Sequence, residues 1–171
     1  MKKSIFIAML MLLVGAFTPT TTHTEPVLPD IKIPNIDCVA EAVYFEARGE
    51  PLEGWAAVAE VVHNRAVAEG IDYCQVINKS KTITTEEGTH TVYQFSYHMY
   101  PKNIKNKKLY DQIYRYVSLH LYKVIALNHR ILDKNVKHYD GKDRTPYWAK
   151  SMTVDKTIGG HTFYKEVAKN G

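Results

Sequence analysis

Cysteine and tryptophan are scarce in this 171-residue chain, which has two residues of each. Several short enzyme motifs are missing as well: the sequence has no G-x-S-x-G, no G-x-G-x-x-G, no phosphate-binding P-loop, no H-E-x-x-H and no C-x-x-C. These absences argue against a serine hydrolase with a nucleophile elbow, a nucleotide-binding enzyme, and a short-motif zinc or thiol–disulfide site. The composition, 45% hydrophobic and 23% charged, is that of a globular chain about the size of one domain.

Long apolar runs are also absent, with one exception. Ile5–Phe17 is unbroken and follows two lysines, and it is shorter than a comfortable membrane span. We therefore expect residues 1–24 to be a signal peptide or, because the cleavage site is poor, an N-terminal anchor. Residues 25–36 are expected to be a linker, and residues 37–171 one domain. This organisation predicts export to the periplasm or beyond, with membrane contact only through residues 1–24.

The charge is unevenly distributed along the rest of the chain. Residues 25–75 hold ten acids and three bases, a net of −7, whereas residues 76–171 hold eight acids and seventeen bases, a net of +9. A nucleic-acid-binding protein would be more uniformly basic, so no nucleic-acid partner is expected. The basic half either faces an acidic polymer or neutralises the acidic half within the fold.

The two cysteines, Cys38 and Cys74, have two interpretations. In an exported chain an even pair favours one disulfide, closing a loop of about 37 residues and adding on the order of 3–4 kcal/mol in the chain-entropy model. The alternative is two free, buried thiols.

Hydrophobic periodicity predicts mostly helix with a minor β part, an α+β fold. Asp37 is expected to cap the first helix, Gly49 to end it and Pro51 to open the second. The expected helices are Cys38–Arg48, Leu52–Ala68 and Leu109–Ile131, with one helical turn at Cys74–Asn78. The expected extended segments are a hairpin of Thr82–Thr85 with Thr89–Phe95, and the short pieces Lys137–Tyr139, Tyr147–Ala149 and His161–Tyr164.

Glu46 is the strongest candidate for acid–base chemistry. It continues the apolar stripe of the first helix, which comprises Val39, Ala42 and Val43. Lost hydration raises the pKa of a carboxyl group, and so do the carbonyl dipoles at the end of a helix. Both effects favour a proton held near neutral pH, as a general acid requires. Arg48 or Arg65 would lower this pKa, and the alternative role is an exposed or ion-paired helix-end carboxylate.

Other polar residues are weaker candidates. Glu50 and Glu53 are expected to cap the second helix, and Asp140 and Asp143 to form a turn, although either could supply a second carboxylate. The eight histidines are scattered, so no metal site and no cofactor are expected, short of a zinc site assembled from distant histidines. Clustered aromatic and amide side chains between Tyr93 and Tyr164 suit a sugar ligand, or are ordinary core residues.

Three blocks of sequence resemble one known family. Cys38–Arg65 reads CVAEAVYFEARGEPLEGWAAVAEVVHNR, in which FEARGEPLEG and AVAEVVHNR are long and specific. The second block is Gln94–Ser96, and the third runs from His138 to Tyr164. Together they resemble the SleB-type cell wall hydrolases, the family that includes the spore cortex-lytic enzymes, over about residues 37–165.

The resemblance implies a lysozyme-like, lytic transglycosylase-related single domain that acts on peptidoglycan glycan strands. We expect the protein to be a monomer. It implies that Glu46 is the catalytic acid/base, cleaving between N-acetylmuramic acid and N-acetylglucosamine, with no protein nucleophile. The residues expected to bind substrate are Gln94, Ser96, Tyr97, His138, Tyr139 and Trp148. The alternatives are muramidase-type hydrolysis of the same bond, an N-acetylmuramoyl-L-alanine amidase and a non-catalytic peptidoglycan-binding protein.

Overall fold

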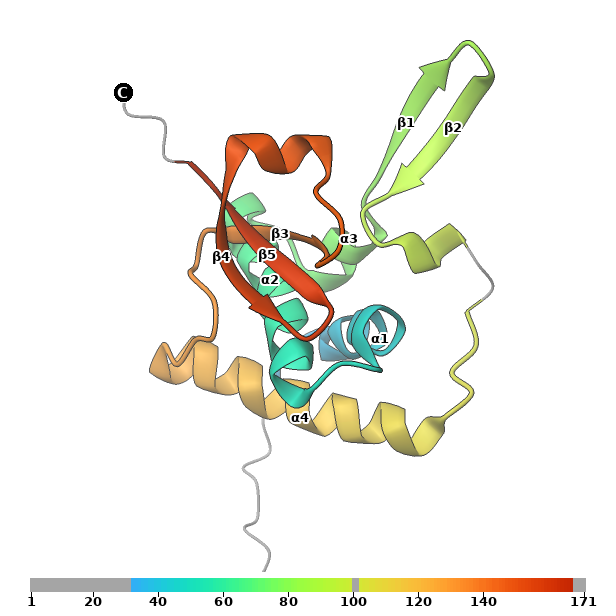
Figure 1. Ribbon diagram of the computed structural model, residues 1–171. Coiled ribbons are helices and arrows are strands. Elements are labelled where there is room, and N and C mark those ends of the chain that lie inside the picture. The colour runs from blue at the N-terminus through green and yellow to red at the C-terminus, as the bar shows by residue number, and fades with distance from the viewer. Residues whose placement is uncertain (1–31, 100–101, 168–171) are drawn as a thin grey trace, which may run out of the picture.

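The computed structural model describes residues 32–99 and 102–167, and Figure 1 shows their arrangement. The expected leader, residues 1–24, and residues 25–31 of the expected linker lie outside the described residues. The helices are α1 (Ile36–Ala47), α2 (Leu52–Glu69), α3 (Tyr73–Asn78) and α4 (Lys107–Leu127), with 3₁₀ turns η1 (Ser96–Met99) and η2 (Tyr147–Ser151). The strands are β1 (Ser80–Thr85), β2 (Gly88–Tyr93), β3 (Val136–Gly141), β4 (Met152–Ile158) and β5 (His161–Glu166).

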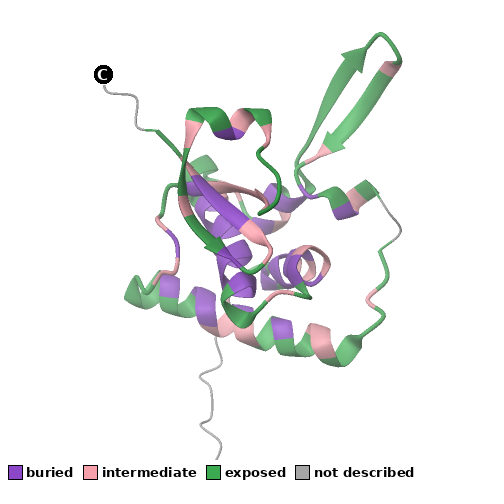
Figure 2. Ribbon diagram, viewed as in Figure 1, coloured by how far each residue is buried: buried purple, intermediate pink, exposed green. Residues whose placement is uncertain are grey.

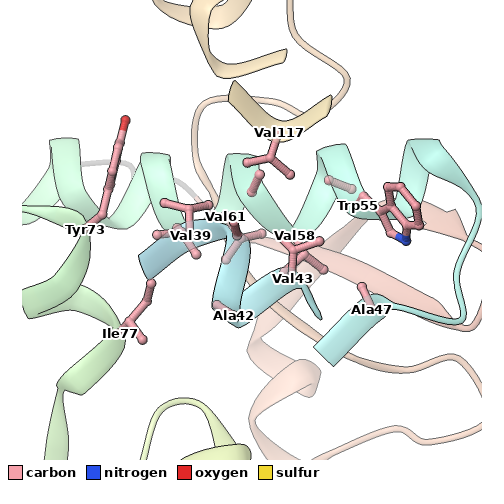
Figure 3. Packing of buried hydrophobic residues seen from close by; sticks show 14 of the residues in the cluster. Val39, Ala42, Val43, Ala47, Trp55, Val58, Val61, Tyr73, Ile77 and Val117 are labelled. Atoms are coloured by element: carbon pink, nitrogen blue, oxygen red, sulfur yellow. The ribbon is translucent and has the colours of Figure 1, made fainter. Parts of the chain in front are cut away.

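Helix α2 lies at the centre of the fold. Every residue from Gly54 to Asn64 is buried, because the helix packs against α1, α3, α4 and β3 on different sides. A helix buried nearly all round is typical of a core position, and its alanines allow neighbouring helices to approach closely. The polar residues in the buried stretch, Glu60, His63 and Asn64, are hydrogen-bonded. Figure 3 shows Val58 and Val61 of α2 among Val39 and Val43 of α1 and Val117 of α4.

A disulfide joins α1 to α3, as predicted for an oxidised chain. Cys38 in the first turns of α1 is bonded to Cys74 in α3, with a Cα–Cα distance of 5.3 Å. The bond closes the loop that contains all of α2, so it fixes the start of α1 beside the helix that follows α2.

Two antiparallel sheets complete the described part. The larger has the strand order β3-β5-β4, with Phe163 of the central strand fully buried against the helices. The smaller is the β1-β2 hairpin, which projects from the body in Figure 1. Figure 2 shows that almost the whole hairpin is exposed.

A buried carboxylate fixes the connection from α4 to β3. Glu60 of α2 has no solvent exposure and accepts hydrogen bonds from the backbone N–H groups of Ile131 (2.7 Å) and Leu132 (2.9 Å). The Nε2 atom of His120 lies 2.7 Å from the same carboxylate. A buried carboxylate needs such partners, and these determine where the chain leaves α4 and enters β3.

Several predicted helix boundaries are wrong. Asn35, in a left-handed conformation with φ 58°, precedes α1, so Asp37 lies in the first turn and is not the cap. Pro51 is the N-cap of α2 and not its first helical residue. Gly49 does follow the C-cap Arg48 of α1, the position that was predicted, but it is not in the left-handed conformation typical of a glycine there. The last helix ends at Leu127 because Asn128 turns left-handed with φ 52°, short of the predicted Ile131.

The C-terminal segment also differs from expectation. Tyr147–Ser151 is a 3₁₀ turn and not an extended piece, with the backbone N–H of Ala149 donating to the carbonyl of Pro146. Strand β4 was not predicted at all. Its residues are exposed except at three positions, and Val154 is 59% exposed, so its sequence carries no apolar alternation to mark a strand.

Candidate active site

Three elements meet at the carboxylate of Glu46. The residue lies in the last turn of α1 and is half-buried. The hydroxyl of Ser96, the first residue of η1, lies 3.5 Å from its Oε1 atom, and the hydroxyl of Tyr139, in β3, lies 3.5 Å from its Oε2 atom. Both hydroxyls are oriented to donate. Segments 50 and 93 residues away in sequence therefore complete the surroundings of one acid.

Burial raises the pKa of the Glu46 carboxyl group above its ordinary value. Hydrogen bonds from the backbone of Tyr97, from the Tyr139 and Ser96 side chains and from the Ser96 backbone act in the opposite direction, because they stabilise the charged form. Desolvation is the largest effect, so the pKa stays raised. This agrees with the direction predicted from the apolar helix stripe.

Neither nearby arginine forms an ion pair with Glu46 among the residues that the structure describes. Arg48 is exposed, and its guanidinium lies over the Tyr44 ring at 5.3 Å. Arg65 donates to the Lys137 carbonyl (2.7 Å) and to the Gln94 side chain (3.1 Å). Arg65 thus joins β3 to the segment that leads into η1, the two elements that contact Glu46.

The predicted substrate residue Tyr97 is buried. Its ring stacks on Phe45 of α1, with centroids 4.9 Å apart and planes 17° apart, and it is only 8% exposed. The phenol oxygen has no hydrogen-bond partner among the described residues, and burial raises the pKa of Tyr97. In this structure Tyr97 thus meets Glu46 through its backbone, and its ring holds η1 against α1.

Tyr139 is held by aromatic neighbours on the helix-facing side of the sheet. Its ring packs edge-on against His161 (5.2 Å) and at a tilt against Phe163 (5.6 Å), both on the neighbouring strand β5. Burial raises its pKa well above the ordinary tyrosine value, and the Glu46 charge adds to this. The Tyr139 hydroxyl therefore stays protonated and remains a donor.

His138 and Trp148 form a separate group. Consecutive residues of a strand point to opposite faces, so His138 lies across the sheet from Tyr139. Its ring is 5.6 Å from that of Trp148, which packs edge-on against Tyr164 at 5.4 Å. The structure thus brings Ser96 and Tyr139 to Glu46, links Gln94 to them through Arg65, and places His138 with Trp148 elsewhere on the sheet.

Glu50 does not cap the second helix as predicted. Its carboxylate accepts the backbone N–H of Gly160, at 2.6 Å, in the turn between β4 and β5. Gly159 in that turn has φ 56°, and a Cβ there would collide with Glu50 and with Pro51. The Gly159–Gly160 pair thus lets the turn close on the α1–α2 connection. The two consecutive glycines are the only feature of the sequence that could have indicated this contact between Glu50 and the β4–β5 turn.

Other sites are not associated with Glu46. Within residues 32–99 and 102–167 no three or more His, Cys, Asp or Glu side chains are grouped to hold a metal ion. Asp140 is not the turn residue that was predicted, because it lies in β3, paired with Thr162, and its side chain accepts the N–H of Gly141 at 2.7 Å. Asp143 lies in a turn as predicted. Two surface hollows, of about 400 Å³ beside Tyr73 and about 450 Å³ beside Trp55, are not lined by Glu46.

No helix in the described part is both long and apolar enough to cross a membrane.

The sequence matches the family described as Cell Wall Hydrolase over residues 49–164, more than half of the chain. The chain belongs to the cell wall hydrolase family. The matched segment begins three residues after Glu46 and includes Glu50, Ser96 and Tyr139. No curated protein matches this cell wall hydrolase.

Two solved structures resemble this cell wall hydrolase. The catalytic domain of Bacillus cereus SleB is 22% identical, with a TM-score of 0.51, and the match covers 76% of this chain and 88% of that domain. The catalytic domain of Bacillus anthracis SleB, a germination-specific lytic transglycosylase, is 23% identical with a TM-score of 0.45, covering 81% and 100% respectively. The first likeness confirms the predicted fold, which is mostly helical with a small β part.

Proposed function

We propose that this cell wall hydrolase cleaves peptidoglycan glycan strands between N-acetylmuramic acid and N-acetylglucosamine, as a lytic transglycosylase with Glu46 as its single acid/base. The observation that carries the proposal is the half-buried carboxyl group of Glu46, with a raised pKa and two hydroxyl donors from distant segments. Residues 37–171 would form the catalytic domain, acting as an exported monomer in the periplasm or outside the cell, with residues 1–24 as leader or anchor.

The reaction needs one group that first gives and then takes a proton. Protonated Glu46 donates its proton to the glycosidic oxygen, and the bond from that oxygen to C1 of the muramic acid breaks. The resulting carboxylate then accepts the proton of the 6-hydroxyl group as that oxygen bonds to C1. The products are a 1,6-anhydromuramic end and a new N-acetylglucosamine 4-hydroxyl group, with Glu46 again protonated.

The surroundings of Glu46 suit both its protonated state, which donates the proton, and its charged state, which accepts one. Desolvation favours the protonated acid before cleavage, when no charge is yet present. The Ser96 and Tyr139 hydroxyls donate to the carboxylate that cleavage creates, and so stabilise the charged state. Because the 6-hydroxyl group of the sugar is the nucleophile, the cycle requires no second protein carboxylate.

The deciding experiment digests purified peptidoglycan sacculi with the parent protein and with Glu46→Gln, and identifies the products by mass spectrometry. We expect 1,6-anhydromuramic ends from the parent and a loss of about 10²-fold or more with the variant. Glu53→Gln, an exposed carboxylate in the first turn of α2, is the matched control and should retain full activity.

Each competing function has its own result. Reducing muramic ends would mean hydrolysis by water and not transglycosylation. Release of stem peptides, lost on adding a chelator, would identify an amidase. If Glu46→Gln degrades sacculi at the parent rate, the assigned acid is wrong, and if neither protein degrades them, the chain is a binding protein.

A further inference from the structure

The β1-β2 hairpin has two chemically different faces. Directly paired residues of an antiparallel hairpin lie on the same face, and the face alternates along each strand. From the observed register, one face carries the side chains of Ser80, Thr82, Thr84, Thr89, Thr91 and Tyr93. All six bear hydroxyl groups, and we call this the hydroxyl face. The opposite face carries Lys81, Ile83, Thr85, Gly88, His90 and Val92.

The hydroxyl face is free to bind a ligand. Five of its six residues are exposed, and Tyr93 at its base is half-buried. A two-stranded hairpin without a packed apolar face is at best marginally stable in water, so this projection gains little from the core of the protein. Figure 2 shows it extending as an exposed arm from the body.

The hydroxyl face leads to the candidate active site. At its base the Tyr93 ring stacks on His98 of η1, with centroids 5.5 Å apart and planes 17° apart. The same turn contains Ser96, whose hydroxyl faces Glu46. The backbone N–H of Gln94 donates to the Lys79 carbonyl at 3.1 Å and closes the hairpin where it joins the body. A polymer reaching Glu46 from this side would run along the hairpin.

The chemistry of the face matches an uncharged, hydroxyl-rich polymer. Each threonine hydroxyl is one donor and two acceptors, which suits sugar hydroxyls and acetamido groups. Threonine is stiff at χ1, so a row of threonines presents its hydroxyls with little rotamer entropy to lose. Thr84 and Thr89 already lie 3.3 Å apart, oxygen to oxygen, across the strands. The face has no charged side chain that would select the acidic stem peptides.

We propose that the hydroxyl face of the β1-β2 hairpin is an extended binding site for the sugar backbone of a peptidoglycan glycan strand, distinct from the groups around Glu46. The inference rests on the proposed function for its ligand. Many weak contacts repeated along a polymer raise the overall affinity, so the site favours long strands over short oligosaccharides.

The test is a pelleting assay in the Glu46→Gln full-length chain, with intact sacculi and with long glycan strands stripped of their stem peptides, at a salt concentration that screens the lactyl carboxylates that stripping exposes. Thr82, Thr84, Thr89 and Thr91 are changed together to valine, which keeps the β-branched shape and removes the hydroxyls. We expect binding to the stripped strands to weaken about tenfold or more, because four hydrogen-bonding groups are lost. The same four changes to serine, which keep the hydroxyls, should retain binding.

The controls separate this site from its alternatives. Lys81→Gln with His90→Gln removes the basic groups of the opposite face and should leave glycan binding unchanged. When Glu46 is retained, the four-valine variant should cleave short soluble glycan oligomers at the parent rate. If the proposed function is wrong, Glu46→Gln will not slow the cleavage of these oligomers. Equal binding by the valine and serine variants, or loss of binding only to strands that carry peptides, would overturn the inference.

Discussion

The hydroxyl of Tyr139 lies 3.5 Å from the carboxylate of Glu46, although 93 residues separate them in sequence. One residue is in the last turn of a helix and the other in a strand of the larger sheet. The contact joins the helical part of the fold to the sheet at the candidate acid. It also gives Tyr139 influence over the protonation of that acid, because a hydroxyl donor stabilises the carboxylate.

Replacing Tyr139 with phenylalanine should raise the pKa of Glu46 further. The general acid must be protonated, so the alkaline limb of the activity profile reports its pKa. We expect that limb to move to higher pH in Tyr139→Phe, and the maximal rate to fall about tenfold, since a hydrogen bond to a charged group is lost. Ser96→Ala should move the limb in the same direction by less, because its hydroxyl lowers the pKa less. A limb that moves to lower pH would contradict this account.

Glu46→Gln should stabilise the protein at alkaline pH. The folded-state pKa of Glu46 is raised, so ionisation disfavours the folded state as the pH rises from the unfolded pKa through the folded one. Glutamine does not ionise. The variant and the parent should therefore have similar free energies of unfolding at pH 4, and the variant should be the more stable at pH 8. Urea denaturation at both pH values measures the difference, and Glu53→Gln should show no comparable gain.

Gly159→Ala should destabilise the fold. The position has φ 56°, and a Cβ there would collide with the Glu50 carboxylate and lie 2.8 Å from the Pro51 ring. We expect the free energy of unfolding to fall by about 2 kcal/mol. Gly49→Ala is the matched control, because nothing lies within 4 Å of a Cβ there and its φ is not left-handed. Equal effects of the two substitutions in thermal unfolding would refute the proposed role of the glycine pair.

Removing the Cys38–Cys74 disulfide should lower the free energy of unfolding by about 3–4 kcal/mol, since the bond closes a loop spanning 36 positions. The variant is Cys38→Ser with Cys74→Ser, measured by urea denaturation. Adding a reductant should destabilise the parent to the same extent and leave the double variant unaffected. A parent that is insensitive to reductant would show that the bond contributes little.

Hydrophobic periodicity along the sequence predicted much of this fold, because the main helices have clear stripes of apolar residues. The buried stripe of Val39, Ala42 and Val43 and the alanine-rich second helix both form where the sequence predicts them. Strand β4 was missed because it is held by pairing with β5 and not by its own apolar residues. Pairing of this kind depends on a distant segment and leaves no local signal.

The candidate site was predictable only in part. The raised pKa of Glu46 follows from its place on the stripe, but the arginines expected to oppose it bind other groups. Ser96 and Tyr139 belong to the cluster of aromatic and polar residues that suits a sugar ligand, but their contacts with Glu46 depend on how η1 and β3 approach α1, which no local pattern predicts. Glu50 was assigned to a helix end, because its partner Gly160 is 110 positions away.

The elements that hold Glu46 and its hydroxyl partners determine how substitutions can alter the candidate site. Helix α1 packs against α2, α3 and α4, so the acid is carried by a helix of the core. Its two hydroxyl partners come from η1 and β3, which belong to no common sheet. Arg65 links the segment that leads into η1 to β3, so a substitution that displaces one hydroxyl partner of Glu46 should displace the other as well, while the acid itself stays on its helix.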